Sequence, residues 1–185
     1  MAEIAAGGRA AFDVLCRRHL QRSVRLAYRV QPCWRDAEEI AQDAFLQVWD
    51  QADSWRADAG ARFSTWFYRV VVNRAIDYRR RHKSFSPLED AGDPPSPDLG
   101  AEAAVEERQL AACIDAVIAD LPERQRAALA LCYYDELTCA EAARVMEVSV
   151  SAMESLLVRA RRAARSKLRD IVGMTGAGLT DGGET

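Results

Sequence analysis

The sequence lacks the long apolar run that a membrane-spanning helix needs, which is about 18 consecutive residues. Its start, MAEIAAGGRAAFDVL, lacks the charged and apolar regions of a secretory signal peptide. We therefore expect a cytoplasmic protein without membrane insertion. Strand-type alternation of apolar and polar residues is also missing along the 185 residues, which argues against a β-rich fold.

The residue types that build metal and nucleophilic sites are scarce. The chain has five cysteines and two histidines, and neither the odd number nor the spacing of the cysteines suggests a disulfide framework. Cys16 and His19 form a lone Cys-x-x-His pair, and no second pair completes a zinc site. Ser, His and Cys are too scattered to indicate a catalytic triad. We expect no enzyme activity, no metal and no cofactor.

Positive charge is concentrated in two segments, although the net charge is −3. Residues 62–83 hold seven basic residues and one acid, and residues 159–169 hold six basic residues and no acid. The acids gather mainly at 36–58, 89–107 and 135–154. Two local basic stripes in an acidic protein indicate that particular surfaces bind a polyanion.

Apolar residues recur at spacings of three and four on both sides of a proline-rich segment. Residues 82–100, HKSFSPLEDAGDPPSPDLG, contain four prolines and no helical period, which is typical of a flexible linker. The predicted fold is all-α, with two small helical domains joined by a flexible linker and a helix-turn-helix in the second. The expected boundaries are 1–83 for the first domain, 84–103 for the linker, 104–172 for the second domain and 173–185 for a disordered tail.

The segment DAEEIAQDAFLQVWD combines an apolar face with an acidic one. Asp36, with Glu39 three residues later, predicts the start of this helix. The acidic face repels DNA and suits the docking of another protein. A charged face that only keeps the protein soluble remains the alternative.

The segment ARFSTWFYRVVVNRAIDYRRR mixes arginines with aromatic residues. At about 100° per residue, a helix places Arg69 and Asn73 on one narrow stripe with Arg62 and Arg80. Arginines hold phosphates, and an amide between them can pair with a base edge. Trp55, in the preceding loop, is a candidate wall for an unstacked base. A core helix with a solvated basic face stays open as the alternative.

The segment LTCAEAARVMEVSVSAMESLLVRARRAARSKL predicts a helix-turn-helix. Thr138 and Glu141 form a T-x-x-E capping box for a short helix, and a longer helix starts near Ser149 and runs to about Ile171. The first residues of such a second helix enter the major groove, and the arginines that follow can hold phosphates. An ordinary helical hairpin with a solvated basic face is the alternative.

In this order, the segments strongly resemble an extracytoplasmic-function (ECF) sigma factor of bacterial RNA polymerase over residues 12–171, apart from the linker. DAEEIAQDAFLQVW resembles region 2.2, and FSTWFYRVVVNRAIDYRRR resembles regions 2.3 and 2.4. LPERQRAALALCYYDELTCAEAARVM resembles region 4.1 with the first helix of region 4.2, and SVSAMESLLVRARR resembles the recognition helix. The resemblance implies that the chain binds core polymerase and recognises the minus-ten and minus-thirty-five promoter elements to start transcription.

The resemblance, with the stripe described above, gives three sets of expected site residues. Those for core polymerase are Asp36, Glu39, Gln42, Asp43 and Phe45. Those for single-stranded minus-ten DNA are Trp55, Arg62, Trp66, Arg69, Asn73, Asp77 and Arg80. Those for minus-thirty-five DNA are Ser149, Ser151, Ala152, Glu154, Ser155, Arg159, Arg161 and Arg162.

The implied partners are core RNA polymerase, through its β′ clamp helices and β subunit, promoter DNA and an anti-sigma factor. Members of the family commonly have threonine, lysine and arginine where this chain has Ala152, Glu154 and Leu156. The start of the recognition helix is therefore less basic than usual, which leaves the upstream promoter sequence open. A stand-alone helix-turn-helix regulator remains an alternative, and so does an anti-sigma or adaptor protein that does not bind DNA.

Overall fold

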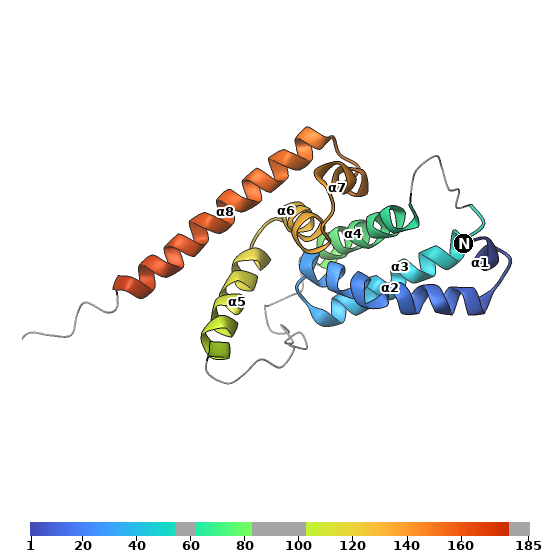
Figure 1. Ribbon diagram of the computed structural model, residues 1–185, viewed down its shortest axis with the longest axis horizontal. Helices are drawn as coiled ribbons and strands as arrows, with labels where there is room; N and C mark the ends of the chain where they lie inside the picture. The colour runs from blue at the N-terminus through green and yellow to red at the C-terminus, as the bar shows by residue number, and fades with distance from the viewer. Residues whose placement is uncertain (55–61, 83–102, 178–185) are drawn as a thin grey trace, which may run out of the picture.

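The computed structural model describes residues 1–54, 62–82 and 103–177, and helices make up nearly all of them (Figure 1). No strand occurs in these three ranges, which confirms the all-α prediction. The elements, in chain order, are α1 (Ala2–Ala5), α2 (Arg9–Val30), α3 (Trp34–Asp50), α4 (Phe63–His82), α5 (Ala103–Ala119), α6 (Glu123–Leu129), the π-helical turn η1 (Ala130–Tyr134), α7 (Cys139–Met146) and α8 (Val150–Ala177).

Helices α2, α3 and α4 pack around a common core and form, with α1, the N-terminal unit (Figure 1). Leu26, Ile40 and Phe67 represent the three long helices in this core, and each has at most 2% of its surface exposed. They belong to the apolar stripes seen in the sequence, because residues three or four apart lie on one face of a helix. Burial of these stripes positions the remaining faces of α3 and α4 at the surface.

Helix α3 begins three residues earlier than predicted, because Asp36 was expected to be its N-cap. Its N-cap is Cys33, which has extended backbone angles of φ −139° and ψ 120°, so the prediction that Asp36 opens the helix is wrong. The Asp36 carboxylate instead accepts hydrogen bonds from Gln31 Nε2 at 3.1 Å and from the Tyr78 hydroxyl at 3.2 Å. Asp36 therefore links α3 to Gln31 and to Tyr78 of α4 instead of capping the helix.

The C-terminal unit, α5 to α8, contains the predicted helix-turn-helix. Thr138 Oγ1 accepts a hydrogen bond from the Glu141 backbone N–H at 3.3 Å, and Glu141 accepts one from the Thr138 N–H at 3.0 Å, which confirms the capping box. Helix α7 ends at Met146, and the left-handed backbone of the next residue, Glu147 (φ 53°), turns the chain toward α8. The Ser149 hydroxyl accepts the Ala152 N–H at 3.1 Å and so caps α8.

Helix α8 continues to Ala177, beyond the end expected near Ile171. Gly173 does not stop it, since a glycine inside a helix costs only about 1 kcal/mol relative to alanine. The first five residues of the predicted disordered tail are therefore helical, and its remainder lies outside the described residues, as does the predicted linker up to residue 102.

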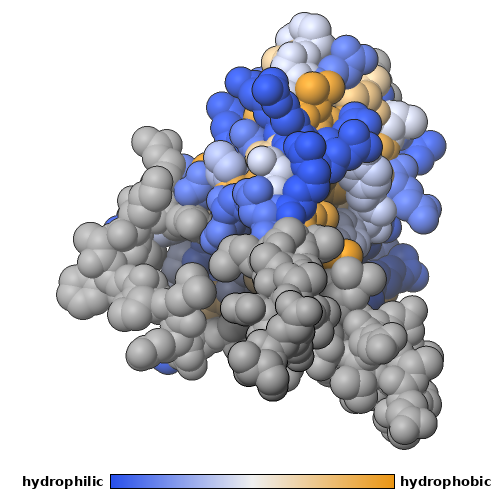
Figure 2. Space-filling view, turned by 90° about the vertical axis from the view of Figure 1, so that its left-hand side faces the viewer, coloured by the Kyte–Doolittle hydropathy of each residue, from blue (hydrophilic) through white to orange (hydrophobic). Residues whose placement is uncertain are grey.

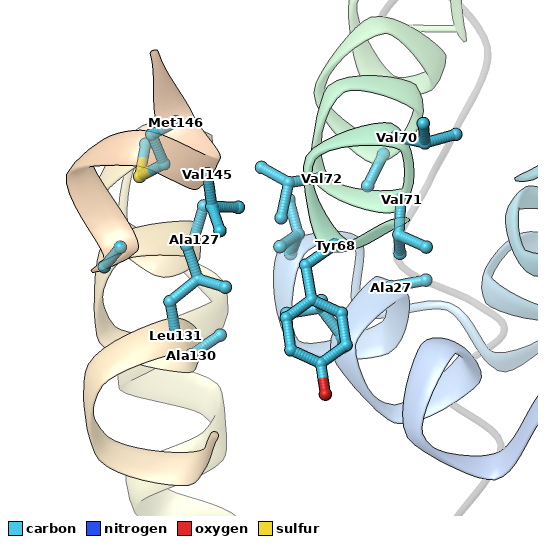
Figure 3. Close-up of a cluster of buried hydrophobic side chains, with 14 of the residues drawn as sticks. Ala27, Tyr68, Val70, Val71, Val72, Ala127, Ala130, Leu131, Val145 and Met146 are labelled. Atoms are coloured by element: carbon cyan, nitrogen blue, oxygen red, sulfur yellow. The ribbon is translucent and has the colours of Figure 1, made fainter. Parts of the chain in front are cut away.

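The two units share one apolar core. Figure 3 shows Val72 of α4 facing Val145 of α7, with Tyr68 beside them and Leu131 of η1 nearby. Val72, Val145 and Leu131 are fully buried. Arg29 of α2 also places its guanidinium 4.0 Å from the centre of the Tyr134 ring, a favourable cation–π geometry. The N-terminal and C-terminal units are thus closed on each other.

Candidate nucleic-acid interface

A polar groove of about 380 Å³ runs between α4 and the end of α3. Four residues that the sequence predicts for minus-ten DNA line it: Trp66, Arg69, Asn73 and Asp77. The other lining residues are Gln47, Gln51, Val70, Arg74 and Arg81. The groove therefore contains one indole ring, the side-chain amides of asparagine and glutamine, and three guanidinium groups.

The other three residues predicted for minus-ten DNA, Arg62, Trp55 and Arg80, do not line the groove as far as the structure describes them. Arg62 is exposed just before α4 begins and does not line the groove. Arg80 belongs to α4, but its side chain lies outside the described part of the chain, and so does the whole of Trp55. The stripe of Arg62, Arg69, Asn73 and Arg80 is thus resolved at its centre, where Asn73 is exposed and Arg69 is half-buried.

Arg74 was not singled out from the sequence, yet it joins the two walls of the groove. Its Nε donates to Gln47 Oε1 at 3.0 Å, and its Nη1 donates to Asp43 Oδ2 at 2.9 Å. It lies next to Asn73 in the chain but off the predicted stripe. The two glutamine residues come from α3 and the residue that follows it, so only the packing of α3 on α4 brings them to the groove.

The acidic face of α3 lies on the surface, as the helical pattern predicts. Glu39, Gln42 and Asp43 are exposed. The hydroxyl of Tyr78 donates to Asp36 at 3.2 Å and to Glu39 at 3.3 Å. Burial, together with these two carboxylates, raises the pKa of Tyr78 to about 12, so the phenol stays protonated and keeps α4 tied to one edge of this face.

Phe45 does not share that surface. Only 6% of it is exposed, and its ring centre lies 4.9 Å from that of Phe67 in the core. Its position in the apolar stripe of α3 requires this burial, so Phe45 is removed from the surface predicted for polymerase contact. Leu46, which the sequence did not single out, is 60% exposed and lies on the outer side of α3.

The first two turns of α8 present a polar surface. Ser149, Ser151, Glu154 and Ser155 are exposed, and Ala152 is half-buried. Met153 and Leu157, both buried, hold α8 against the rest of the C-terminal unit. Val150 is 44% exposed at the start of the helix, which adds an apolar contact that the sequence did not single out.

The predicted phosphate-binding arginines follow along α8. Arg159, Arg161 and Arg162 are all exposed. Figure 2 views the molecule from the end where α5 and α8 lie, and the described surface there is mainly hydrophilic with small apolar spots. A hydrophilic surface of this kind suits contact with water or with a charged ligand.

The described residues contain no group of three His, Cys, Asp or Glu side chains placed to hold a metal ion. In the same ranges, no helix combines the length and apolarity needed to cross a bilayer.

Comparison with known families matches both units. The family Sigma-70 region 2 matches residues 15–85, and the family Sigma-70, region 4 matches residues 111–163. The chain is 30% identical over 179 residues to the ECF RNA polymerase sigma factor SigW of Bacillus subtilis, covering 91% of this chain and 95% of the relative. It is 34% identical over 176 residues to the ECF RNA polymerase sigma factor SigM of Mycobacterium tuberculosis, covering 94% and 83%.

Two solved structures have the same arrangement of helices. CnrH in complex with the cytosolic domain of CnrY gives a TM-score of 0.64 at 25% identity, over 91% of this chain and 94% of that one. The sigma factor RpoE in complex with the anti-sigma factor NepR from Bartonella quintana gives a TM-score of 0.66 at 18% identity, over 86% and 97%. The second likeness concerns the fold alone.

A helix-turn-helix beside a groove of arginine, tryptophan and amide side chains is typical of a nucleic-acid-binding protein. With the family matches, the conclusion is direct: the chain belongs to the ECF RNA polymerase sigma factors. It is a transcription-initiation factor that works with core RNA polymerase at promoter DNA. A stand-alone helix-turn-helix regulator would leave the region 2 match over residues 15–85 unexplained.

Proposed function

We propose that the groove between α3 and α4 holds the unpaired strand of the minus-ten element. The observation that carries this proposal is the position of Asn73, which is exposed in a groove that also contains Trp66 and Arg69. An indole face stacks on an unstacked base, and a guanidinium holds the phosphate beside it. An amide at the same place can then pair with the edge of the base.

The exposed start of α8 reads minus-thirty-five duplex DNA in this proposal. Helices of this kind insert their N-terminal residues into the major groove, where Ser151 and Ser155 can donate and accept hydrogen bonds. Glu154 can accept from a cytosine amino group. Arg159, Arg161 and Arg162, one to two turns later, can hold the phosphate backbone and make the affinity depend on salt.

The acidic face of α3 is the proposed docking surface for core polymerase, with Glu39, Gln42 and Asp43 as its exposed members and Asp36 at its edge. We also infer an anti-sigma partner, because both solved structures described above are complexes with a second protein, and NepR in one of them is an anti-sigma factor. The reaction itself belongs to core polymerase, so this chain needs no catalytic group. Its place of action is then the cytoplasm.

The division at 1–83, 84–103 and 104–172 is proposed as the functional division of the chain. Each of the two helical parts carries one DNA-reading surface, the groove in the first and the start of α8 in the second. Residues 84–103 then join a reader of unpaired DNA to a reader of duplex DNA.

The Asn73→Ala variant is expected to bind core polymerase normally but to form open promoter complexes roughly five- to 150-fold less efficiently. The reason is that each good side-chain pair to a base contributes about 1–3 kcal/mol. Permanganate footprinting and run-off transcription, with a promoter selected from a library by the wild-type holoenzyme, measure this loss. Gln21→Ala, which removes an exposed amide from α2, serves as the control. Normal melting by Asn73→Ala would refute the proposed role of the groove.

Charge reversal by Asp43→Arg is expected to weaken the affinity for core polymerase at least tenfold, since like charges placed across an interface cost several kcal/mol. Asp43 also pairs with Arg74 at 2.9 Å, so the loss of that pair needs its own control. Arg74→Met removes the same ion pair and leaves the acidic face intact. Binding of labelled variants to core polymerase without DNA is the measurement, and equal affinities for Asp43→Arg and wild type would count against this face.

A further inference from the structure

Three carboxylates lie in or next to α7. Asp135 precedes the helix, Glu141 is in its first turn, and Glu147 follows its last residue, Met146. We call these three residues the acidic edge. Helix α7 packs directly on α4, so the acidic edge lies near the arginines of that helix.

Glu147 binds an arginine of the groove. Its Oε1 accepts a hydrogen bond from Arg69 Nη1 at 2.9 Å. The left-handed backbone of Glu147 (φ 53°) holds this side chain at the turn between the two helices of the helix-turn-helix. Arg69 lies one helical turn from Asn73, so the carboxylate occupies a cation that faces the proposed path of the unpaired strand.

Glu141 lies near a second arginine of the minus-ten set. Hydrogen bonds from Thr138 lower the pKa of Glu141 most strongly, and the nearby guanidinium groups of Arg144 and Arg62 lower it further. Arg144 belongs to α7 itself, whereas Arg62 stands just before α4. The field of Arg62 therefore reaches across the boundary between the two units.

Asp135 makes the third contact, with Arg22 of α2. Arg22 Nε donates to Asp135 Oδ1 at 2.7 Å, and its Nη2 donates to the Asp135 backbone oxygen at 3.1 Å. Asp135 is only 6% exposed, and its other carboxylate oxygen accepts no hydrogen bond in the described structure. Because Asp135 is buried and only one of its carboxylate oxygens is hydrogen-bonded, the stability of its charged form depends strongly on Arg22.

The start of α8, which is the surface proposed to read duplex DNA, is not bound by the acidic edge. Ser151, Glu154 and Ser155 are exposed on α8 while Glu147, only a few residues earlier, is bound to Arg69. The closed chain therefore leaves the start of α8 accessible, while Glu147 neutralises Arg69 in the groove. In the closed chain, the start of α8 is accessible to DNA, whereas the groove has its Arg69 already paired with a carboxylate.

We propose that the acidic edge is an intramolecular substitute for DNA phosphate: Glu147 occupies Arg69 in the closed chain and must leave before the unpaired strand binds. This inference rests on the proposed role of the groove. Glu147 and a phosphate compete for the charge of the same guanidinium, and the Glu147 carboxylate repels a phosphate that approaches Arg69. The closed chain binds duplex DNA through α8 and has reduced affinity for single strands.

The test compares two charge-matched double variants of the full chain. Glu141→Gln with Glu147→Gln removes two carboxylates of the acidic edge, and glutamine keeps the capping box at Thr138. Asp120→Asn with Asp170→Asn removes two carboxylates elsewhere in the C-terminal unit; Asp120 pairs with Lys167 in the same unit. The probe is a fluorescent oligothymidylate of about 20 nucleotides, long enough for a binding groove of this kind. Anisotropy gives its affinity, and circular dichroism confirms that each variant is folded.

The acidic-edge variant is expected to bind the probe up to about fivefold more tightly than wild type, because an exposed ion pair such as that of Glu147 with Arg69 contributes roughly 0.2–1 kcal/mol. The control variant is expected to gain much less. Equal gains in both variants, or no gain in either, would overturn the proposal. Adding Arg69→Ala to the acidic-edge variant should abolish its gain.

The same series separates this inference from the proposed function. If Arg62→Ala with Arg69→Ala leaves probe binding and promoter melting unchanged in the holoenzyme, the groove does not hold the unpaired strand. If those arginine variants lose binding while the acidic-edge variant gains none, only the competition by the acidic edge is refuted.

Discussion

Replacing Arg126 with methionine is expected to lower the free energy of unfolding by about 3 kcal/mol. Arg126 is 1% exposed, and its guanidinium donates to the backbone oxygen of Val30 at 2.8 Å, to that of Leu121 at 3.1 Å and to that of Ala119. Val30 is the last residue of α2, and Ala119 is the last residue of α5. One cation thus satisfies the carbonyl ends of two helices, where the helix dipoles favour positive charge.

Urea denaturation followed by circular dichroism measures this loss as a lower midpoint. Arg124→Met is the control, because Arg124 is exposed two residues away on the same helix. The control should stay within about 0.5 kcal/mol of wild type, as most surface substitutions do. An Arg126→Met protein as stable as the Arg124→Met protein would show that the three carbonyls are satisfied without the guanidinium.

A carboxylate at position 72 is expected to separate the two units without unfolding them. Val72 is fully buried where α4 meets α7, and Figure 3 shows it pointing at Val145. An unpaired buried charge costs several kcal/mol, and in Val72→Asp this cost is relieved when the C-terminal unit moves away. We expect a larger radius of gyration by small-angle X-ray scattering, with most of the helical circular dichroism retained.

Val71→Asp is the matched control for that experiment. Val71 is equally buried, but Figure 3 shows it beside Ala27 of α2, inside the N-terminal unit. Separation of the units does not expose position 71, so its carboxylate reaches water only when the N-terminal unit unfolds. Loss of helical signal in Val71→Asp but not in Val72→Asp is the expected pair of results. Unfolding of both variants would show that the N-terminal unit is not stable apart from its partner.

The helices and the helix-turn-helix could be predicted because their signals are local. The stripe of Arg69 and Asn73 follows from the angle between successive residues on a helix, and the capping box at Thr138 from two side chains three residues apart. The start of α3 was missed because Asp36, a good N-cap residue by type, is used in contacts with Gln31 and Tyr78. Side-chain chemistry alone does not reveal such a competing tertiary role.

The second wall of the groove and the contact between the two units could not be predicted in the same way. Gln47 and Arg74 meet at 3.0 Å although 27 residues separate them in the chain. One signal for the contact between units was present, since Val70, Val71 and Val72 follow one another on α4 and cannot all face the same neighbour. A helix with three successive buried valines has partners on more than one side.

The core shared by the two units also affects how well this sigma factor competes with others for a limited amount of core polymerase. If core polymerase binds only the opened chain, its apparent dissociation constant equals the intrinsic value divided by the opened fraction. Every 1.4 kcal/mol that favours closure then weakens apparent binding about tenfold. Val72 and Arg126 would therefore influence which sigma factor occupies the enzyme when several are present, although neither side chain lies on the surface proposed to touch it.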